Sequence, residues 1–480
     1  MSSYNAHFHG PLRRNPANPR YFTDDSGQAV YLTGSHTWSV MQDMWPENEE
    51  RRNMDYDGFL RMLTDYGHNF LRFWQFTLYT RGCPCNKYDV LSDPLPYLRT
   101  GPGLANDGLP KFDLTKFNEA YFDRLRERVI KAGQNGIYSS VMMFEAWSLK
   151  WAAPDKQPWV YHVFNPANNV NGITDDPVYP NGNYWGVFTL KCPAINEYQK
   201  AFVAKVIDTV NGLDNVLYEI CNEVPFTLES LEWQKAMCAY IREYEAGKPK
   251  RHMIGITPEG GDDLNERYMD LDCDWYSPSN GWKFEYRYNP SPSDGRKVLL
   301  NDTDHLWGHG CEVSWIWKSF TRGMNVLFMD PWEPFPGDLD WWQDGDVSRN
   351  GRYYYAWDGM RRNLGLTRAL AKCFDLNLFV PDLDFCTSTY CLANKGSQYI
   401  CYFPAGGYEG VDLRGTDGEF TAEWLDPATG ITHKGGAVRA SGAEGVRRAA
   451  LRAPFDGPAV LLLFKERKYI PPRWEIYRRP

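Results

Sequence analysis

Short apolar runs alternate with longer amphipathic stretches from about residue 29 to residue 373 of this 480-residue chain. The short runs are rich in β-branched and aromatic residues, as buried parallel strands are, and the longer stretches follow the 3.6-residue period of a helix. Eight such pairs follow one another, which predicts an α/β fold, a (β/α)8 TIM barrel. The strand candidates are residues 30–33, 70–76, 138–144, 216–221, 253–257, 275–278, 298–301 and 326–329.

The helices between these strands can be located by their apolar faces and end signals. One is expected to start after a cap at Asp113 or Thr115 and to end near Gly133, and two others are expected at about 196–210 and 353–372. The apolar face of the first carries Phe122, Leu125, Val129 and Ala132.

Loop lengths indicate which end of the barrel carries the functional site. Helix-to-strand links such as 134–136 and 212–214 are tight, whereas two strand-to-helix links are long, at about 77–112 and 146–194. Strand-to-helix loops form the C-terminal face of a TIM barrel, where its active sites lie. We therefore expect the site at that face.

The sequence pattern changes after about Phe374. Short strands separated by Gly, Pro and Asp turns replace the helical period, and strands are expected at 398–403, 419–425 and 459–464. The chain is therefore predicted to form a barrel over residues 1–374 and a small all-β sandwich over 375–480. The short, apolar linker near Asp375 predicts that the sandwich packs on the barrel.

Charge and hydropathy restrict the partners. The formal net charge is -9 and Lys and Arg are scattered, which disfavours nucleic acid, and no run of 18 apolar residues could span a bilayer. The first residues, MSSYNAHFHGPLRRNP, contain no apolar signal segment. We expect a cytoplasmic protein if Met1 is native, and a secreted or periplasmic one if a signal has been removed. The sequence does not predict an oligomeric state.

Cysteines and aromatic residues give weaker indications of function. The 11 cysteines are spread through predicted strands and helices, as buried reduced thiols are, and the Cys83–Cys85 pair has no further ligands nearby. The 19 Trp, 30 Tyr and 25 Phe offer flat faces that suit sugar rings, although ordinary core packing uses the same residues.

The fourth predicted strand ends in the pair Asn222-Glu223. A carboxylate at the end of an apolar barrel strand lies at the mouth, and the neighbouring amide can hold a substrate hydroxyl. Glu223 is therefore the proton-donor candidate, because a buried strand rarely ends in an unpaired carboxylate.

The seventh predicted strand is apolar and then abruptly acidic, with Asp302 and Asp304 on the same face. Strands four and seven lie across the mouth from each other, so one carboxylate from each can flank a glycosidic bond. Carboxyl groups about 5 to 5.5 Å apart support a covalent intermediate, and groups about 6.5 to 9.5 Å apart leave room for water and inversion. The alternative is that either Asp is solvated or caps the next helix.

Other polar residues are expected at the same face. An Arg inside a strand needs an anion, so Arg72 is predicted to pair with a carboxylate across the mouth or to form a structural ion pair. Together with Asn222 and His305, the predicted substrate-binding residues are His36, Arg72, Glu145, Tyr276, Asp330 and Trp332.

Metal and cofactor chemistry have less support in the sequence. His7 and His9 precede the first barrel strand, and residue 306, after His305, is Leu where a zinc-protease helix has its Glu. The sequence also lacks a G-x-S-x-G motif and a Gly-rich phosphate loop. We therefore predict neither a metal nor a cofactor.

These features resemble the retaining glycoside hydrolases of clan A, which carry an Asn-Glu acid/base after strand four and a carboxylate nucleophile after strand seven. Asn222-Glu223 matches that pair, and Arg72 and Trp332 fall where the clan often has an Arg and a Trp. The resemblance implies a hydrolase acting on a plant or microbial oligosaccharide or polysaccharide.

Within the clan, residues 21–38 (YFTDDSGQAVYLTGSHTW) and 117–138 look like the apiosidase-like catalytic domain of family 140. Residues 423–430 (EWLDPATG) are similar to the β domain, labelled as collagen-binding, that often follows it. Clan members usually end strand seven with Glu, whereas this chain has Asp302 and Asp304; the resemblance favours Asp304 as nucleophile. The alternative is a carbohydrate-binding or scaffold protein on a barrel that has lost its strand-seven Glu.

Overall fold

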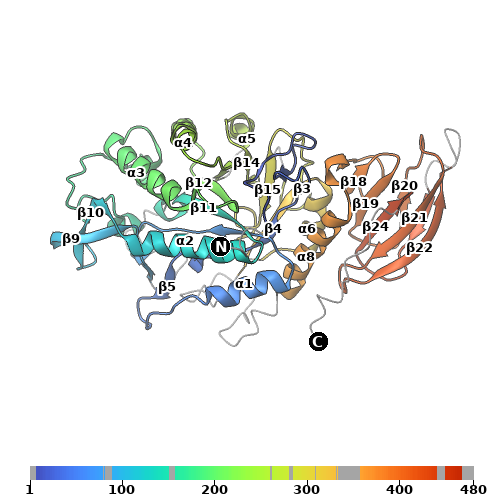
Figure 1. The fold of residues 1–480 in the computed structure, drawn as a ribbon, viewed down its shortest axis with the longest axis horizontal. Coiled ribbons are helices and arrows are strands. Elements are labelled where there is room, and N and C mark those ends of the chain that lie inside the picture. The colour runs from blue at the N-terminus through green and yellow to red at the C-terminus, as the bar shows by residue number, and fades with distance from the viewer. Residues whose placement is uncertain are drawn as a thin grey trace.

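A computed structural model shows a barrel and a β domain side by side (Figure 1). It describes residues 7–78, 80–81, 89–150, 157–259, 262–280, 285–308, 310–330, 332, 357–440 and 449–466.

Eight parallel strands form the barrel, which confirms the predicted fold class. In order around the sheet they are β4 (Thr33–His36), β16 (Asn325–Met329), β15 (Val298–Asp302), β14 (Trp275–Tyr276), β13 (Ile254–Pro258), β12 (Val216–Val224), β11 (Tyr138–Glu145) and β6 (Phe70–Phe73). Strands β4 and β6 close the ring: the backbone N–H of Asn69, the residue before β6, donates to the carbonyl of Thr33 in β4 at 3.0 Å.

The first strand begins three residues later than the sequence indicates. Val30 belongs instead to β3 (Ala29–Val30), which pairs with β2 (Phe22–Thr23) and, through it, with β1 (Arg13–Arg14) in a separate antiparallel sheet. The apolar run at 30–33 is therefore shared between two sheets, and the barrel uses its C-terminal end.

Helices surround the barrel strands. The cap predicted for α2 is wrong: Asp113 and Thr115 lie in β10 (Pro110–Phe117), and Asn118 precedes the helix. The helices are α1 (Tyr56–Asp65), α2 (Glu119–Gln134), α3 (Pro193–Val210), α4 (Leu228–Ala246), α5 (Asp262–Met269), α6 (Val313–Thr321) and α8 (Asp358–Cys373).

An apolar cluster fills the N-terminal half of the barrel interior. Trp275 and Leu217 point inward with residues from neighbouring strands, and Phe8 and Phe22 from the N-terminal segment cover them. A Cβ at Gly255 would lie 1.8 Å from the Trp275 ring, so a glycine is needed there. This end of the barrel is packed and dry.

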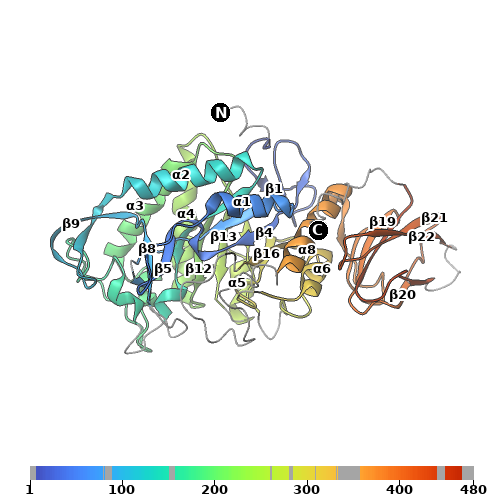
Figure 2. The same ribbon diagram turned by 90° about the horizontal axis from the view of Figure 1, so that it is seen from below.

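The loop after β6 builds most of the additional structure. It carries β7 (Thr80–Arg81) and β8 (Val90–Asp93), and β8 pairs with both β7 and β5 (Asp43–Pro46). It also carries the hairpin of β9 (Tyr97–Leu104) with β10. The hairpin projects at one end of the molecule and the β domain lies at the other (Figure 2). The loop after β11 contains short 3-10 helices.

The C-terminal region is all antiparallel. The three predicted strands appear as β19 (Gln398–Phe403), β21 (Glu419–Leu425) and β24 (Ala459–Phe464). A six-stranded sheet also contains β17 (Val380–Pro381), β18 (Cys391–Asn394) and β22 (Thr432–Arg439), and a smaller sheet pairs β20 (Tyr408–Val411) with β23 (Ala449–Arg452). Buried side chains of both sheets form one cluster, as in a sandwich.

The other face of the six-stranded sheet packs on the barrel. Trp317 and Phe320 of α6 and Leu366 of α8 share a buried cluster with Ile400 and Tyr402 of β19. The β domain therefore packs on the barrel helices, as expected. Within the part of the chain that the structure describes, no helix is long and apolar enough to cross a membrane.

Candidate active site

Arg72 lies at the centre of a buried polar network at the C-terminal end of the strands. It points inward from β6 and is 1% exposed. Its Nε donates to Glu219 Oε2 at 2.9 Å and its Nη2 to Glu219 Oε1 at 2.5 Å, and Nη2 also donates to Asn222 Oδ1 at 2.7 Å. The guanidinium thereby joins strands two and four through a two-pronged ion pair.

The same guanidinium contacts both acids of strand seven. Nη1 donates to Asp302 Oδ2 at 3.0 Å and to Asp304 Oδ2 at 3.1 Å. Asp302 is also 2.9 Å from His36 Nε2, and it accepts the backbone N–H of Asp304 at 3.0 Å. Trp74 donates to His36 Nδ1 at 2.8 Å, which leaves Nε2 to donate to Asp302.

These contacts set the charge of Asp302. Burial alone would raise its pKa, but His36 and the Arg72 guanidinium outweigh burial and hold the pKa well below its usual range. Asp302 is therefore a fully buried, ionised carboxylate whose oxygens are occupied by protein donors.

The end of β12 explains how two consecutive residues face the site. The pairing with β13 shifts register between Glu219 and Asn222, so these residues, three apart, share a face. Glu223 then adopts a φ of +47°, a left-handed conformation that costs a non-glycine residue roughly 1 to 2 kcal/mol. This backbone turns Glu223 toward the same side as Asn222.

Glu223, Asp304 and His305 meet at the mouth. His305 Nδ1 is 3.7 Å from Glu223 Oε1 and 3.8 Å from Asp304 Oδ2, and one oxygen of each carboxylate and this nitrogen lie within 4.8 Å of one another. The side chains of Glu223, Asp304 and His305 are 12%, 7% and 1% exposed. The two carboxylates thus face each other in a nearly dry site.

Burial and the neighbouring charges shift the pKa values of this trio. Burial raises the pKa of Glu223 to about 7; His305 acts against that shift and Asp304 adds to it. Burial would lower the pKa of His305, but the charge of Asp304 and the interaction with the Glu223 side chain raise it. With a pKa of about 7, Glu223 is about half protonated at neutral pH, which lets it both give and take a proton.

Among the described residues, Glu223, Asp304 and His305 could also offer three ligand atoms to a metal ion. Arg72 already neutralises Asp304 at 3.1 Å, and a second positive charge beside it would be repelled. The arrangement suits two carboxylates of different protonation state. The sequence prediction of no metal stays a prediction.

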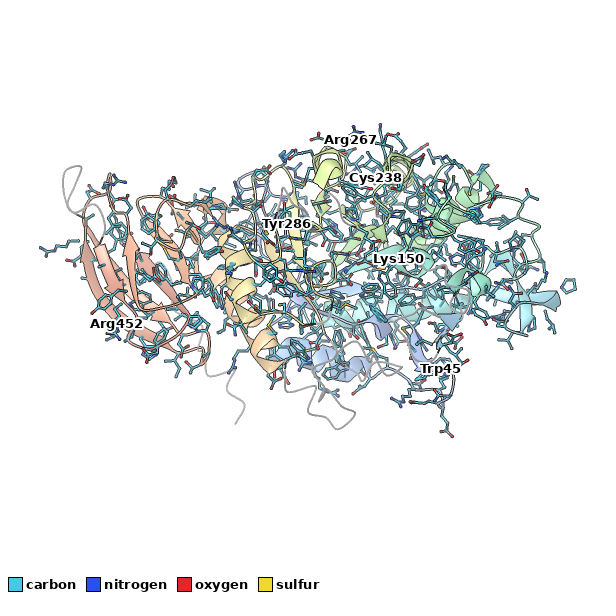
Figure 3. All side chains as sticks on the ribbon, turned by 180° about the vertical axis from the view of Figure 1, so that it is seen from behind. Trp45, Lys150, Cys238, Arg267, Tyr286 and Arg452 are labelled. Carbon is cyan, nitrogen blue, oxygen red and sulfur yellow. The ribbon has the colours of Figure 1, made fainter. Side chains whose placement is uncertain are left out.

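Glu145 and Lys150 border the trio on the side of β11. Glu145 pairs with Asn222 across the strands and accepts the Ser148 N–H at 2.9 Å. Lys150 donates to Glu259 Oε1 at 2.8 Å and lies over the Trp147 ring. In Figure 3, Lys150 is labelled near the middle of the barrel, and its positive charge lowers the pKa of Glu223.

Three predicted substrate-binding residues have described contacts with residues outside this cluster. Tyr276 is buried in the layer between strands and helices, because in the two-residue β14 it is Trp275 that points inward. Asp330 accepts two hydrogen bonds from Arg361 of α8, at 2.6 and 2.7 Å. Trp332 packs edge-on against Phe59 of α1.

Sequence reasoning missed Glu219 and Trp74. Glu219 is an isolated acid inside an apolar strand, and the signal for it was the buried Arg72, whose five N–H donors need more than one acceptor group. Trp74 orients His36 and belongs to an aromatic wall with Trp38 and Phe76. Thr257 completes the network by donating to Glu219 at 2.7 Å.

Comparisons with known proteins add the fold relationship. The sequence model of a domain of unknown function, DUF6298, matches residues 93–262. No curated protein matches this sequence.

Among solved structures, a glycoside hydrolase family 5 protein from Bacteroides vulgatus is similar at a TM-score of 0.58 and 12% identity, covering 95% of this chain and 93% of that chain. Another, described as a glycoside hydrolase, has a TM-score of 0.56 and 13% identity, with 96% and 98% covered. Both matches extend over the barrel and the β domain, so the two-part fold is shared.

Proposed function

We propose that this chain is a retaining glycoside hydrolase in which Glu223 is the acid/base and Asp304 the nucleophile. The observation that carries the proposal is the meeting of the two carboxylates across the barrel mouth, with oxygens within 4.8 Å. Retaining enzymes hold their carboxyl groups about 5 to 5.5 Å apart, and inverting enzymes about 6.5 to 9.5 Å apart. The spacing therefore supports double displacement.

Glu223 has the properties of the proton donor. Its pKa of about 7 leaves about half of the molecules with a protonated Glu223 at neutral pH, so both the acid and the base form are available to the reaction. It gives its proton to the glycosidic oxygen as the bond to the anomeric carbon breaks. Once the leaving group departs, the Glu223 carboxylate removes a proton from the incoming water.

Asp304 is the better of the two nucleophile candidates. Asp302 has no exposed surface and is held by His36, Arg72 and the Asp304 backbone, so its oxygens are directed at protein donors. Asp304 lies at the mouth, and Arg72 keeps a positive charge beside it. Asp304 attacks the anomeric carbon to form a glycosyl ester, which water then hydrolyses to return the carboxylate.

Asn222 and Glu145 are placed to bind the sugar beside these groups. Asn222 Oδ1 accepts from Arg72, whereas its Nδ2 makes no hydrogen bond to any residue that the structure describes. That amide group can donate to a sugar hydroxyl. We propose that His36 and Arg72 act through Asp302 and Asp304, and that His305 lies beneath the bound sugar.

The proposed substrate is a plant or microbial oligosaccharide or polysaccharide. Its support is the fold shared with two glycoside hydrolases and the aromatic wall of Trp38, Trp74 and Phe76 beside the network. The resemblance of residues 21–38 to the apiosidase-like domains of family 140 adds pentofuranosides to the candidates.

The test is turnover of a panel of aryl glycosides and plant and microbial polysaccharides. We expect at least one substrate to be hydrolysed, with activity falling about 10²- to 10⁴-fold in Glu223→Gln. Glu266→Gln, which changes an exposed acid paired with Arg296, is the control and should be unaffected. Saccharide binding without turnover by the wild-type protein would favour the carbohydrate-binding alternative.

A further inference from the structure

The β domain holds the loop between β14 and β15 through one tyrosine. Tyr390, which precedes β18, donates its hydroxyl to Asn289 Oδ1 at 2.7 Å. Tyr390 is 8% exposed and belongs to the cluster between the barrel and the β domain. Asn289 lies in the barrel loop of residues 285–297, so this bond joins the two domains at the edge of the active-site face.

The residues beside Asn289 pack on Trp307. The rings of Tyr288 and Trp307 meet edge to face with centroids 5.1 Å apart, and the Arg287 guanidinium lies 5.3 Å above the Trp307 ring. On its other side the loop is fixed to α6, because Trp315 donates to the Tyr286 carbonyl and Lys318 to the Tyr288 carbonyl, both at 2.8 Å. In Figure 3, Tyr286 lies between Lys150 and the β domain.

Trp307 belongs to the turn that carries the candidate nucleophile. The Thr303 carbonyl accepts the backbone N–H groups of Leu306, Trp307 and Gly308 at 3.0, 2.6 and 2.8 Å. Asp304 and His305 lie inside this tightly bonded turn. A displacement of the Trp307 ring therefore moves Asp304 and His305 relative to Glu223, which is on another strand.

We infer that Tyr390 is a positioning residue: the β domain sets the place of Asp304 and His305 through Asn289, Tyr288 and Trp307. Every contact in this chain of residues is at hydrogen-bonding or ring-packing distance. The inference extends the proposed function to the β domain, and it rests on that function in the experiment that measures activity. The β domain then influences the active site although none of its residues lies in that site.

Tyr31 provides a matched control. It belongs to the same buried cluster as Tyr390, and its hydroxyl donates to Thr367 Oγ1 at 3.2 Å. Thr367 is on α8, so this bond does not involve the loop of residues 285–297. Tyr31→Phe and Tyr390→Phe each remove one hydroxyl and keep the ring, and similar losses of stability are expected from the two.

The first experiment compares kcat, KM and Tm for the two variants. We expect Tyr390→Phe to lower kcat about tenfold or more, because a catalytic group displaced by about 1 Å can lower the rate by as much as about 10²-fold. Tyr31→Phe should keep the wild-type kcat at a similar Tm. Asn289→Ala should reproduce the kcat loss, and the double variant should lose no more than either single one. Equal kcat in all variants would overturn the inference.

The second experiment needs no substrate. Hydrogen–deuterium exchange should rise at residues 303–308 in Tyr390→Phe and stay at the wild-type rate there in Tyr31→Phe. Unchanged exchange at 303–308 in Tyr390→Phe would overturn the inference even for an active hydrolase. Raised exchange in a protein that hydrolyses no glycoside would sustain the inference while the proposed function fails.

Discussion

The two halves of the barrel interior are built on the same strands and have opposite chemistry. In β6, Phe70 faces the dry base and Arg72 the mouth; in β12, Leu217 is followed by Glu219; in β15, Leu300 is followed by Asp302. Each strand changes from apolar to charged over two residues. The base therefore contributes stability through apolar burial, whereas the mouth buries charges whose desolvation opposes folding.

The largest effect on stability is expected at the mouth, for Arg72→Met. This change leaves Glu219 and Asp304 without their buried counter-charge, which should cost about 3 to 5 kcal/mol in the free energy of unfolding. Denaturant unfolding measures the loss, and Arg72→Met with Glu219→Met should recover part of it. The network would be less important than we argue if the single variant unfolded like Arg296→Met, which alters exposed ion pairs.

A similar loss of stability is expected at the base, for Trp275→Ala. Removing a buried Trp typically costs about 3 to 5 kcal/mol, and Trp275 has no exposed surface. The kcat of the folded protein should nevertheless stay within about threefold of wild type, because the chemistry is at the other end of the strands. A kcat loss well beyond about threefold in the folded variant would show that the two halves are not independent.

The base was easier to predict from sequence than the mouth. Apolar runs identified all eight barrel strands and three strands of the β domain, because burial on both faces leaves a continuous apolar signal. The first strand was misplaced because residues 30–33 serve two sheets. The α2 cap was wrong because β10 extends the chain to Phe117.

The mouth depends on details that the sequence does not encode locally. The register shift in β12 and the positive φ of Glu223 bring Glu219, Asn222 and Glu223 to one face, and strict alternation would have separated them. Tyr276 seemed suited to the site by its polarity, yet the strand directs Trp275 inward. Asp330 follows a strand and therefore suits a site at the mouth, but the fold brings Arg361, some 30 residues later in the chain, beside it as an ion-pair partner.

A smaller effect, of opposite sign, is expected for Glu223→Gln. Because the folded protein holds the Glu223 proton up to a pKa of about 7, against 4.5 for the ordinary group, ionising Glu223 increasingly opposes folding as pH rises from 4.5 to 7. Glu223→Gln should therefore unfold like wild type near pH 4 and be more stable by about 1 to 3 kcal/mol above pH 7. Thermal unfolding across this range checks it, and a gain confined to acidic pH would contradict it.

The smallest effect concerns the pH profile of an active enzyme. Because Glu223 must be protonated to act as the acid, kcat/KM should fall as pH rises through about 7. Lys150 lowers the pKa of Glu223, so Lys150→Met should move this fall to higher pH by a fraction of a unit. Lys205→Met, which removes an ion pair between α3 and Glu119 of α2, is the control. A shift to lower pH in Lys150→Met would be inconsistent with the proposed acid.

The central claim is that Asp304 attacks the sugar while Asp302 holds the network, and azide rescue tests it most directly. Asp304→Gly should lose hydrolysis and recover turnover with added azide, because the small anion takes the place of the missing carboxylate and yields a glycosyl azide. Asp302→Asn should lower activity without rescue. Rescue by azide at Asp302 instead would reverse the two roles. Glu333 follows the eighth predicted strand in the sequence and lies outside the described residues, and rescue only in Glu333→Gly would contradict the assignment of the nucleophile to strand seven.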